Sequence, residues 1–271
     1  MVHARAFSFY DDAVSVALPS PGKANNSLSS GPTAKNPPDA SVPLFRLRQL
    51  QSDWYQTLYQ GNPTDVTSLI WRKCFEMWEW SERLPTDIPA PIREMLDLEL
   101  RYSYVYCISS SARDDQMSAY GRLLIFEHAI SYMDRIYDIS NLAANAAFYT
   151  YHDALRVFFM GSQFVAVLRD AGDLLLSGSH VPMPPSVPGN VSPPPPPIRL
   201  DRGSGDNLDR SLRCLDRVKL TLGLYGARWK NALSLMESFK MISAEVSKSL
   251  TTRQAMKNAT TAGQWQPVRD A

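Results

Sequence analysis

The sequence predicts an all-α fold: an irregular bundle of about seven or eight helices, a flexible N-terminal loop and a proline-rich insertion. Apolar residues recur at spacings of three and four along most of the chain after residue 43. No segment alternates polar and apolar residues as a half-buried strand does. The 271 residues are 44% apolar, which is enough for one large core or two small ones.

The first predicted helix covers residues 42–60, VPLFRLRQLQSDWYQTLYQ. It follows residues 19–43, which are dense in Pro, Ser, Asn and Gly and therefore predict a loop. One side of the helix is apolar and its charges are mixed, so we expect it to pack against other helices. The apolar side consists of Leu44, Leu47, Leu50, Trp54 and Leu58.

A second helix is predicted to begin at NPTD, residues 62–65. Asn62 can cap it, Pro63 suits the first turn, and Asp65 favours the positive end of the helix dipole. The helix should end at Leu84-Pro85, because the residue before a proline avoids helical geometry. Its expected buried stripe is Val66, Ile70, Cys74, Met77 and Trp78.

Two further helices are predicted on either side of the polar break SSSARDDQ, residues 109–116. The one before it begins at Pro91, with Met95, Leu98, Tyr102, Val105 and Ile108 on one side. The one after it presents Leu123, Phe126, Ile130, Met133 and Tyr137. Residues 142–176 predict one long helix or two, with Gly161 as a break or a point of close packing.

The C-terminal part is predicted to be two helices preceded by an extended linker. Residues 181–197 are rich in proline and end in PPPPP, which neither helix nor sheet accommodates. Leu208, Leu212, Leu215 and Leu222 then mark one helix face. Beyond Gly223 and Gly226 a last helix carries Trp229, Ala232, Met236, Phe239, Val246 and Leu250.

These elements group into five predicted regions. Residues 1–43 form an N-terminal extended segment and Ser/Pro-rich loop, and 44–176 form the main helical region. Residues 177–206 are the proline-rich linker, 207–251 are a helical pair, and the polar residues 252–271 are expected to be a disordered tail.

Charge and cysteine usage narrow the classes of function. The net charge of +1 predicts no strong attraction of the whole chain to nucleic acid or anionic lipid. Cys74, Cys107 and Cys214 are widely spaced, so they predict buried thiols in a reducing compartment, with neither a disulfide framework nor a zinc site.

The longest uncharged apolar run, residues 157–168, is too short to cross a bilayer. We expect a soluble intracellular protein.

Asp114-Asp115 offers the strongest hint of catalysis. All-α enzymes that use isoprenoid diphosphates hold magnesium with aspartates on helices. Here no third carboxylate follows at the needed spacing, so acids in the first turn of a helix are the simpler interpretation. An isoprenoid-diphosphate enzyme that uses these two aspartates remains an alternative function.

Other polar motifs are weaker. The histidines, His3, His128, His152 and His180, form no H-E-x-x-H pattern. Arg210, Arg213 and Arg217 could bind phosphate, although Asp209 and Asp216 lie among them and favour a solvent-exposed helix face. Pro182, Pro185 and Pro188 have the P-x-x-P spacing that docks into aromatic grooves, so a proline-motif interaction module is a second alternative.

The segments follow one another in a distinctive order. YDDAVSVALPSP, with the acidic Asp11-Asp12, is followed by FRLRQLQSDWYQTLY, a Trp-rich helix ending in ERLP, and LDLELRYSYVYCISSSAR. Then come LLIFEHAISYMDRI, TYHDALRVFFMGSQFVAVL and LRCLDRVKLTLGLYGARWKNALSLMESFK. This order resembles the C-terminal half of the middle homology region of fungal binuclear zinc cluster transcription factors, over roughly residues 8–245.

Several short matches carry this resemblance. Members of the family often have Leu-Pro-Ser, as at residues 18–20, and Leu-Gln-Ser, as at residues 50–52. A Leu-Pro after a tryptophan and an Arg-Trp pair within a helix correspond to Leu84-Pro85 and Arg228-Trp229. At ISSSAR, residues 108–113, the chain departs from the Arg-Pro-Ser or Ser-Pro-Ser turn of many members.

The resemblance implies a nuclear role in gene regulation, often of metabolism, with no enzymatic activity. The family contacts DNA through six cysteines that share two zinc ions, whereas this chain has three cysteines and no C-x-x-C. We therefore expect a truncated regulator or a stand-alone modulator. It would contact proteins of the transcription machinery or another regulator subunit, without specific DNA contact or membrane binding. The family also implies a small-molecule inducer pocket, for which the sequence singles out no residue. We assign no catalytic, cofactor-binding or metal-binding residues.

Overall fold

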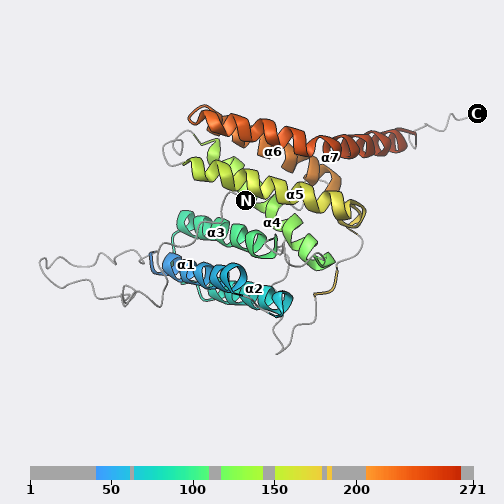
Figure 1. Ribbon diagram of the computed structural model, residues 1–271. Coiled ribbons are helices and arrows are strands. Elements are labelled where there is room, and N and C mark those ends of the chain that lie inside the picture. Colours follow the sequence, from blue (N-terminus) through green and yellow to red (C-terminus); the bar gives the residue numbers. More distant parts are fainter. Residues whose placement is uncertain are drawn as a thin grey trace, which may run out of the picture. The chain divides into compact units, whose positions relative to one another are not determined.

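A computed structural model describes residues 41–61, 64–109, 117–142, 150–178, 182–184 and 206–263 (Figure 1). These ranges contain seven α-helices and no strand, which confirms the predicted all-α class. The helices form two compact units, with α1–α3 in the first and α4–α7 in the second. The boundary at Gln116–Met117 differs from the predicted grouping, which placed the C-terminal helical pair apart from residues 44–176.

The first unit begins with α1, Ser41–Tyr55, which continues as a π-helical turn, η2, Gln56–Gln60. Together they match the predicted helix at 42–60. Leu47, Trp54 and Leu58 are buried, as the apolar stripe predicted. This helix is therefore a packing helix of its own unit.

The second helix, α2, Val66–Glu82, has its N-cap three residues after Asn62, the predicted cap. Asp65 is the N-cap, and its side chain accepts a hydrogen bond from the Ser68 amide at 2.9 Å. A carboxylate satisfies a free helix amide and also favours the positive end of the dipole, so Asp65 performs both functions that we divided between Asn62 and Asp65. The buried side is Ile70, Trp71, Lys73, Cys74, Met77 and Trp80.

The third helix, α3, Ala90–Ser109, corrects the predicted face in one place. Met95 is 42% exposed, whereas Leu96 and Leu100 are buried. Buried residues cover a wide arc of α3, so a single stripe of three- and four-residue spacings did not identify its inner side. Gln51 of α1 donates a hydrogen bond to the Ser103 hydroxyl at 2.5 Å, which joins the two helices within the core.

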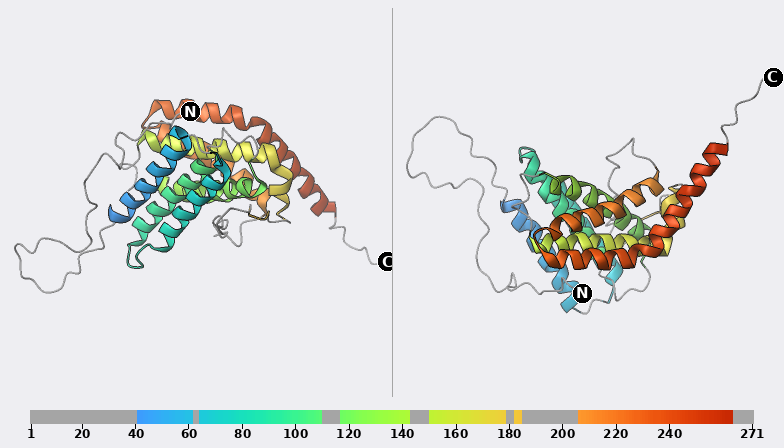
Figure 2. Two further views of the ribbon diagram at one scale, coloured as in Figure 1. Left: turned by 60° about the horizontal axis from the view of Figure 1, so that its bottom comes forward. Right: turned by 90° about the horizontal axis from the view of Figure 1, so that it is seen from above.

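The second unit contains α4, Ala119–Ser140, and α5, Tyr151–Ser177, followed by α6, Asn207–Gly226, and α7, Lys230–Gly263. α6 and α7 lie side by side, and α5 packs against both (Figure 1 and Figure 2). The largest fully buried side chains include Phe126, Phe164 and Phe239, which come from three of the four helices. The rings of Phe126 and Phe164 stack at 5.4 Å between centroids.

Gly161 is a close-packing point and not a break. A Cβ atom there would lie 2.8 Å from the ring of Phe239 and 2.9 Å from Val218. Only a glycine lets α6 and α7 approach α5 this closely. The irregular backbone of α5 lies further on, at Ala171, where φ is −142° and ψ is 30°.

Two predictions about the C-terminal helices are wrong. Arg228-Trp229 lies in the tight connection between α6 and α7, not within a helix, and the Trp229 amide donates to the Tyr225 carbonyl at 2.8 Å. Residues 252–263, expected to belong to a disordered tail, continue α7. In this stretch Arg253 forms an ion pair with Asp173, and Lys257 forms ion pairs with Asp206 and Asp209. The composition of the stretch does not reveal these contacts.

We expect Gly161→Ala to lower the free energy of unfolding by about 1–3 kcal/mol, because the added methyl group overpacks the contact with Val218 and Phe239. Gly172→Ala is the matched control, since no atom lies within 4 Å of its Cβ position. That variant should be neutral or more stable by up to about 1 kcal/mol. Denaturant unfolding monitored by fluorescence measures both. Equal stability of the two variants would contradict the close packing.

Candidate functional site

A buried ion pair joins α4 to α6. The two terminal guanidinium nitrogens of Arg210 donate to the Glu127 carboxylate, at 3.0 and 2.6 Å. Arg210 also donates to the Asn207 side chain at 2.8 Å, and its guanidinium lies over the Phe126 ring. Bidentate geometry of this kind is among the strongest polar contacts in proteins. Because both side chains are almost fully buried, each charge is stabilised by the other in place of water.

A second ion pair repeats this contact two helical turns further along both helices. Arg217 pairs with Asp134, and its guanidinium lies 5.2 Å from the centre of the Tyr137 ring. Burial raises the pKa of Asp134, although Arg217 opposes that change. Both pairs join residues 83 positions apart. Equal steps on both helices mean that α4 and α6 run parallel in a single register.

The prediction of a solvent-exposed arginine face on α6 is therefore wrong. Arg210 is only 4% exposed, and Arg217 is partly buried against α4. Their acidic partners lie on another helix, so the neighbouring Asp209 and Asp216 gave a misleading signal. The matching two-turn spacing of Glu127 with Asp134 and of Arg210 with Arg217 was the available clue.

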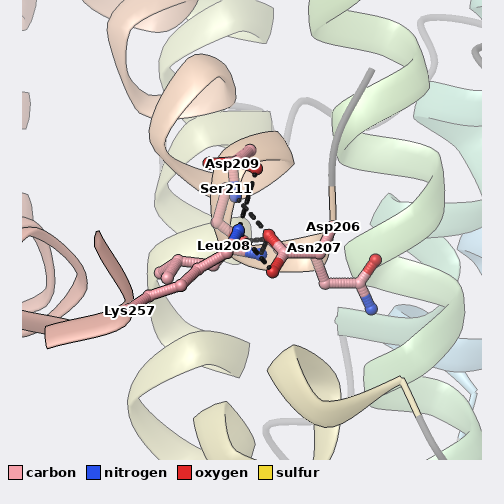
Figure 3. A network of polar contacts seen from close by, with 6 residues as sticks. All are labelled: Asp206, Asn207, Leu208, Asp209, Ser211 and Lys257. Carbon is pink, nitrogen blue, oxygen red and sulfur yellow. Dashed lines mark hydrogen bonds and ion pairs between the residues drawn. The ribbon is translucent and has the colours of Figure 1, made fainter. Parts of the chain in front are cut away.

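The N-terminus of α6 is held by the network in Figure 3. The Asp206 carboxylate accepts hydrogen bonds from the amides of Leu208 and Asp209, at 3.1 and 3.0 Å. The Lys257 ammonium of α7 donates to Asp206 at 2.9 Å. The carboxylate thus lies between the positive end of α6 and a cation of α7. The network anchors the C-terminal turns of α7 to the start of α6.

Asn207 connects the same turn to α5. Its side-chain amide donates to the Leu175 carbonyl at 2.6 Å, while its carbonyl oxygen accepts from Arg210. Its own backbone carbonyl accepts from the Ser211 hydroxyl. Asn207 thus joins α6 to α5, and Lys257 joins α7 to the start of α6.

The scaffold presents apolar side chains where α6 meets α7. Leu220 and Leu224 lie one turn apart on α6 and are 53% and 44% exposed. Leu233 of α7 is 41% exposed and lies against Gly226, and Met236 lies against Gly223. We call Leu220, Leu224, Leu233 and Met236 the α6–α7 apolar surface. Leu220, Leu224 and Leu233 are exposed, whereas Met236 is half-buried.

Most residues of the alternative functions lie outside the described ranges. These include Asp114, Asp115, Pro185, Pro188, His3 and His180. His128 is buried on α4, and His152 is exposed in the first turn of α5. Within the part of the chain that the structure describes, no group of three or more His, Cys, Asp or Glu side chains could hold a metal ion.

Searches against protein-family models, curated proteins and solved structures find no match for this chain. The resemblance to fungal zinc cluster regulators therefore stays a prediction from short sequence motifs. None of the helices in the described ranges has the length and apolarity needed to span a bilayer.

We expect Arg210→Met to lower the free energy of unfolding by about 3–5 kcal/mol, because Glu127 would remain charged and buried without its partner. Adding Glu127→Leu should recover much of this loss, since the double variant buries no charge. Lys240→Met is the control, because its pair with Glu237 is exposed and should contribute less than about 1 kcal/mol. Denaturant unfolding of the unchanged chain and of these three variants measures the losses, and Glu127→Leu alone completes the cycle that gives the coupling. A small effect of Arg210→Met alone would contradict it.

Proposed function

We propose that this chain is a transcription-regulatory domain of the fungal zinc cluster type, located in the nucleus and acting through protein contacts. It carries out no catalysis under this proposal. Its three cysteines do not supply a six-cysteine DNA-binding cluster, so any DNA contact comes through another protein or another segment. The partner is a component of the transcription machinery or another regulator subunit.

The pairing of Asp134 with Arg217 carries the proposal. Asp134 belongs to LLIFEHAISYMDRI and Arg217 to LRCLDRVKLTLGLYGARWKNALSLMESFK, two of the segments on which the resemblance rests. Glu127 of the first segment likewise pairs with Arg210, just before the second. Charged residues of the resembling segments are thus used to hold a helical scaffold together. This use suits a regulatory domain better than an active site.

The α6–α7 apolar surface is the part of this scaffold suited to a protein partner. Leu220 and Leu224 lie one and two turns beyond Arg217, on the side of α6 that the two ion pairs fix to α4. A partner would therefore meet a surface that is already ordered, which lowers the entropy lost on binding.

We expect the full chain, fused to a heterologous DNA-binding domain in a fungal cell, to raise or lower expression of a reporter gene. Leu220→Glu/Leu224→Glu should reduce that change, because two carboxylates would oppose burial of the surface in an interface. Both side chains are about half exposed, so the variant should still fold. Reporter output and the thermal midpoint of the purified fusion are measured together.

Ser249→Glu/Asn258→Glu is the matched control, because it adds the same charge at exposed polar positions of α7. It should leave reporter output unchanged. A folded, nuclear fusion that gives the same reporter output as the DNA-binding domain alone would refute the proposed function. An equal loss in both double variants would refute the assignment of the surface.

The source of DNA contact has its own test, which is to map the native transcript upstream of Met1. An in-frame exon that encodes six cysteines with C-x-x-C pairs would make the chain the regulatory half of a DNA-binding regulator. A transcript that starts just before Met1 would make it a stand-alone modulator.

A further inference from the structure

Two cysteines meet in the core of the first unit. Cys74 lies on α2 and Cys107 on α3, two helices that pack together. Both side chains are fully buried between these helices, and Cys107 lies close enough to Cys74 for its side chain to raise the pKa of the Cys74 thiol. The fold therefore brings two oxidisable side chains together, although their wide spacing in the sequence predicted no disulfide framework.

The closed unit protects this pair. Burial raises the pKa of the Cys74 thiol, and the neighbouring Cys107 raises it further. The buried phenol of Tyr104 lies close enough for both cysteines to affect it, together with Arg101 and Asp97. Because both side chains are fully buried, a small oxidant reaches neither sulfur while the helices stay packed, and the raised pKa of Cys74 also disfavours its reactive thiolate. Reaction requires local opening of α2 from α3.

We propose that Cys74 and Cys107 form a redox-sensitive pair that closes to an intramolecular disulfide when local opening admits a low-molecular-weight disulfide of the glutathione type. The inference is independent of the proposed function. It concerns the first unit, whereas the α6–α7 apolar surface belongs to the second.

The reaction proceeds by two exchanges. One cysteine loses its proton, and its thiolate attacks the small disulfide to form a mixed disulfide, releasing one small thiol that takes up a proton. The other cysteine then attacks the protein sulfur of that mixed disulfide and releases the second small thiol. Two protein thiols are oxidised, and one small disulfide is reduced to two thiols. The new bond joins α2 to α3 and opposes further opening of the helices.

The test is an equilibrium titration of the full chain with reduced and oxidised glutathione, under native conditions and in denaturant. Samples are quenched with acid and alkylated, and free thiols are counted by mass spectrometry. We expect the native chain to fall from three free thiols to one, with a linked Cys74–Cys107 peptide after digestion. The native chain should need at least about tenfold less oxidising conditions than the denatured chain, because the fold holds the sulfurs together.

Cys214→Ala is the matched control, since Cys214 is equally buried but lies on α6. It should still form the disulfide, whereas Cys74→Ala and Cys107→Ala should not. Should either of these two variants fail to fold, the linked peptide of the unchanged chain still decides the result. Equal oxidation of native and denatured chains, or a bond to Cys214, would overturn the proposal.

Discussion

The second unit depends on the buried pair of Glu127 with Arg210 and its repeat, two turns on, by Asp134 and Arg217. A buried carboxylate without its cation is strongly destabilising, so a shift of α6 along α4 would break both contacts at once. The pairs therefore select one register and the parallel orientation of these two helices. The buried apolar side chains of α4 and α6 alone would allow the two helices to pack in several neighbouring registers, because leucine and isoleucine can replace one another in packing.

The other contacts of this unit build on that register. Gly161 lets α5 approach Val218 and Phe239, which come from α6 and α7. Asn207 holds the start of α6 to the end of α5, and Lys257 holds the end of α7 to the same turn of α6. Surface ion pairs such as the one made by Lys257 contribute little singly. Together with the buried apolar side of α7, which includes Val246 and Leu250, these ion pairs stabilise residues 252–263 as a helix. The polar composition of that stretch alone predicts disorder.

The two units differ in the interactions that could serve regulation. The second has a rigid polar framework and an exposed apolar surface, which suits contact with a protein partner. The first has a core in which Gln51, Ser103 and the two thiols lie among apolar side chains. A thiol pair is a neutral packing element when reduced and a covalent link when oxidised, so the same core has two chemical states.

Periodic apolar residues by themselves determined most of the helical segments, because a helix buries one side whatever it packs against. They were sufficient for α1, for most of α2 and α4, and for Gly161 as a possible contact point. Spacing could not show which side of α3 is buried, why Arg210 is inside, or that residues 252–263 are helical. The contact of Cys74 with Cys107 and the partners of the α6 arginines were likewise hidden. Each of these depends on a residue far away in the chain, and only the packing of the helices brings such residues together.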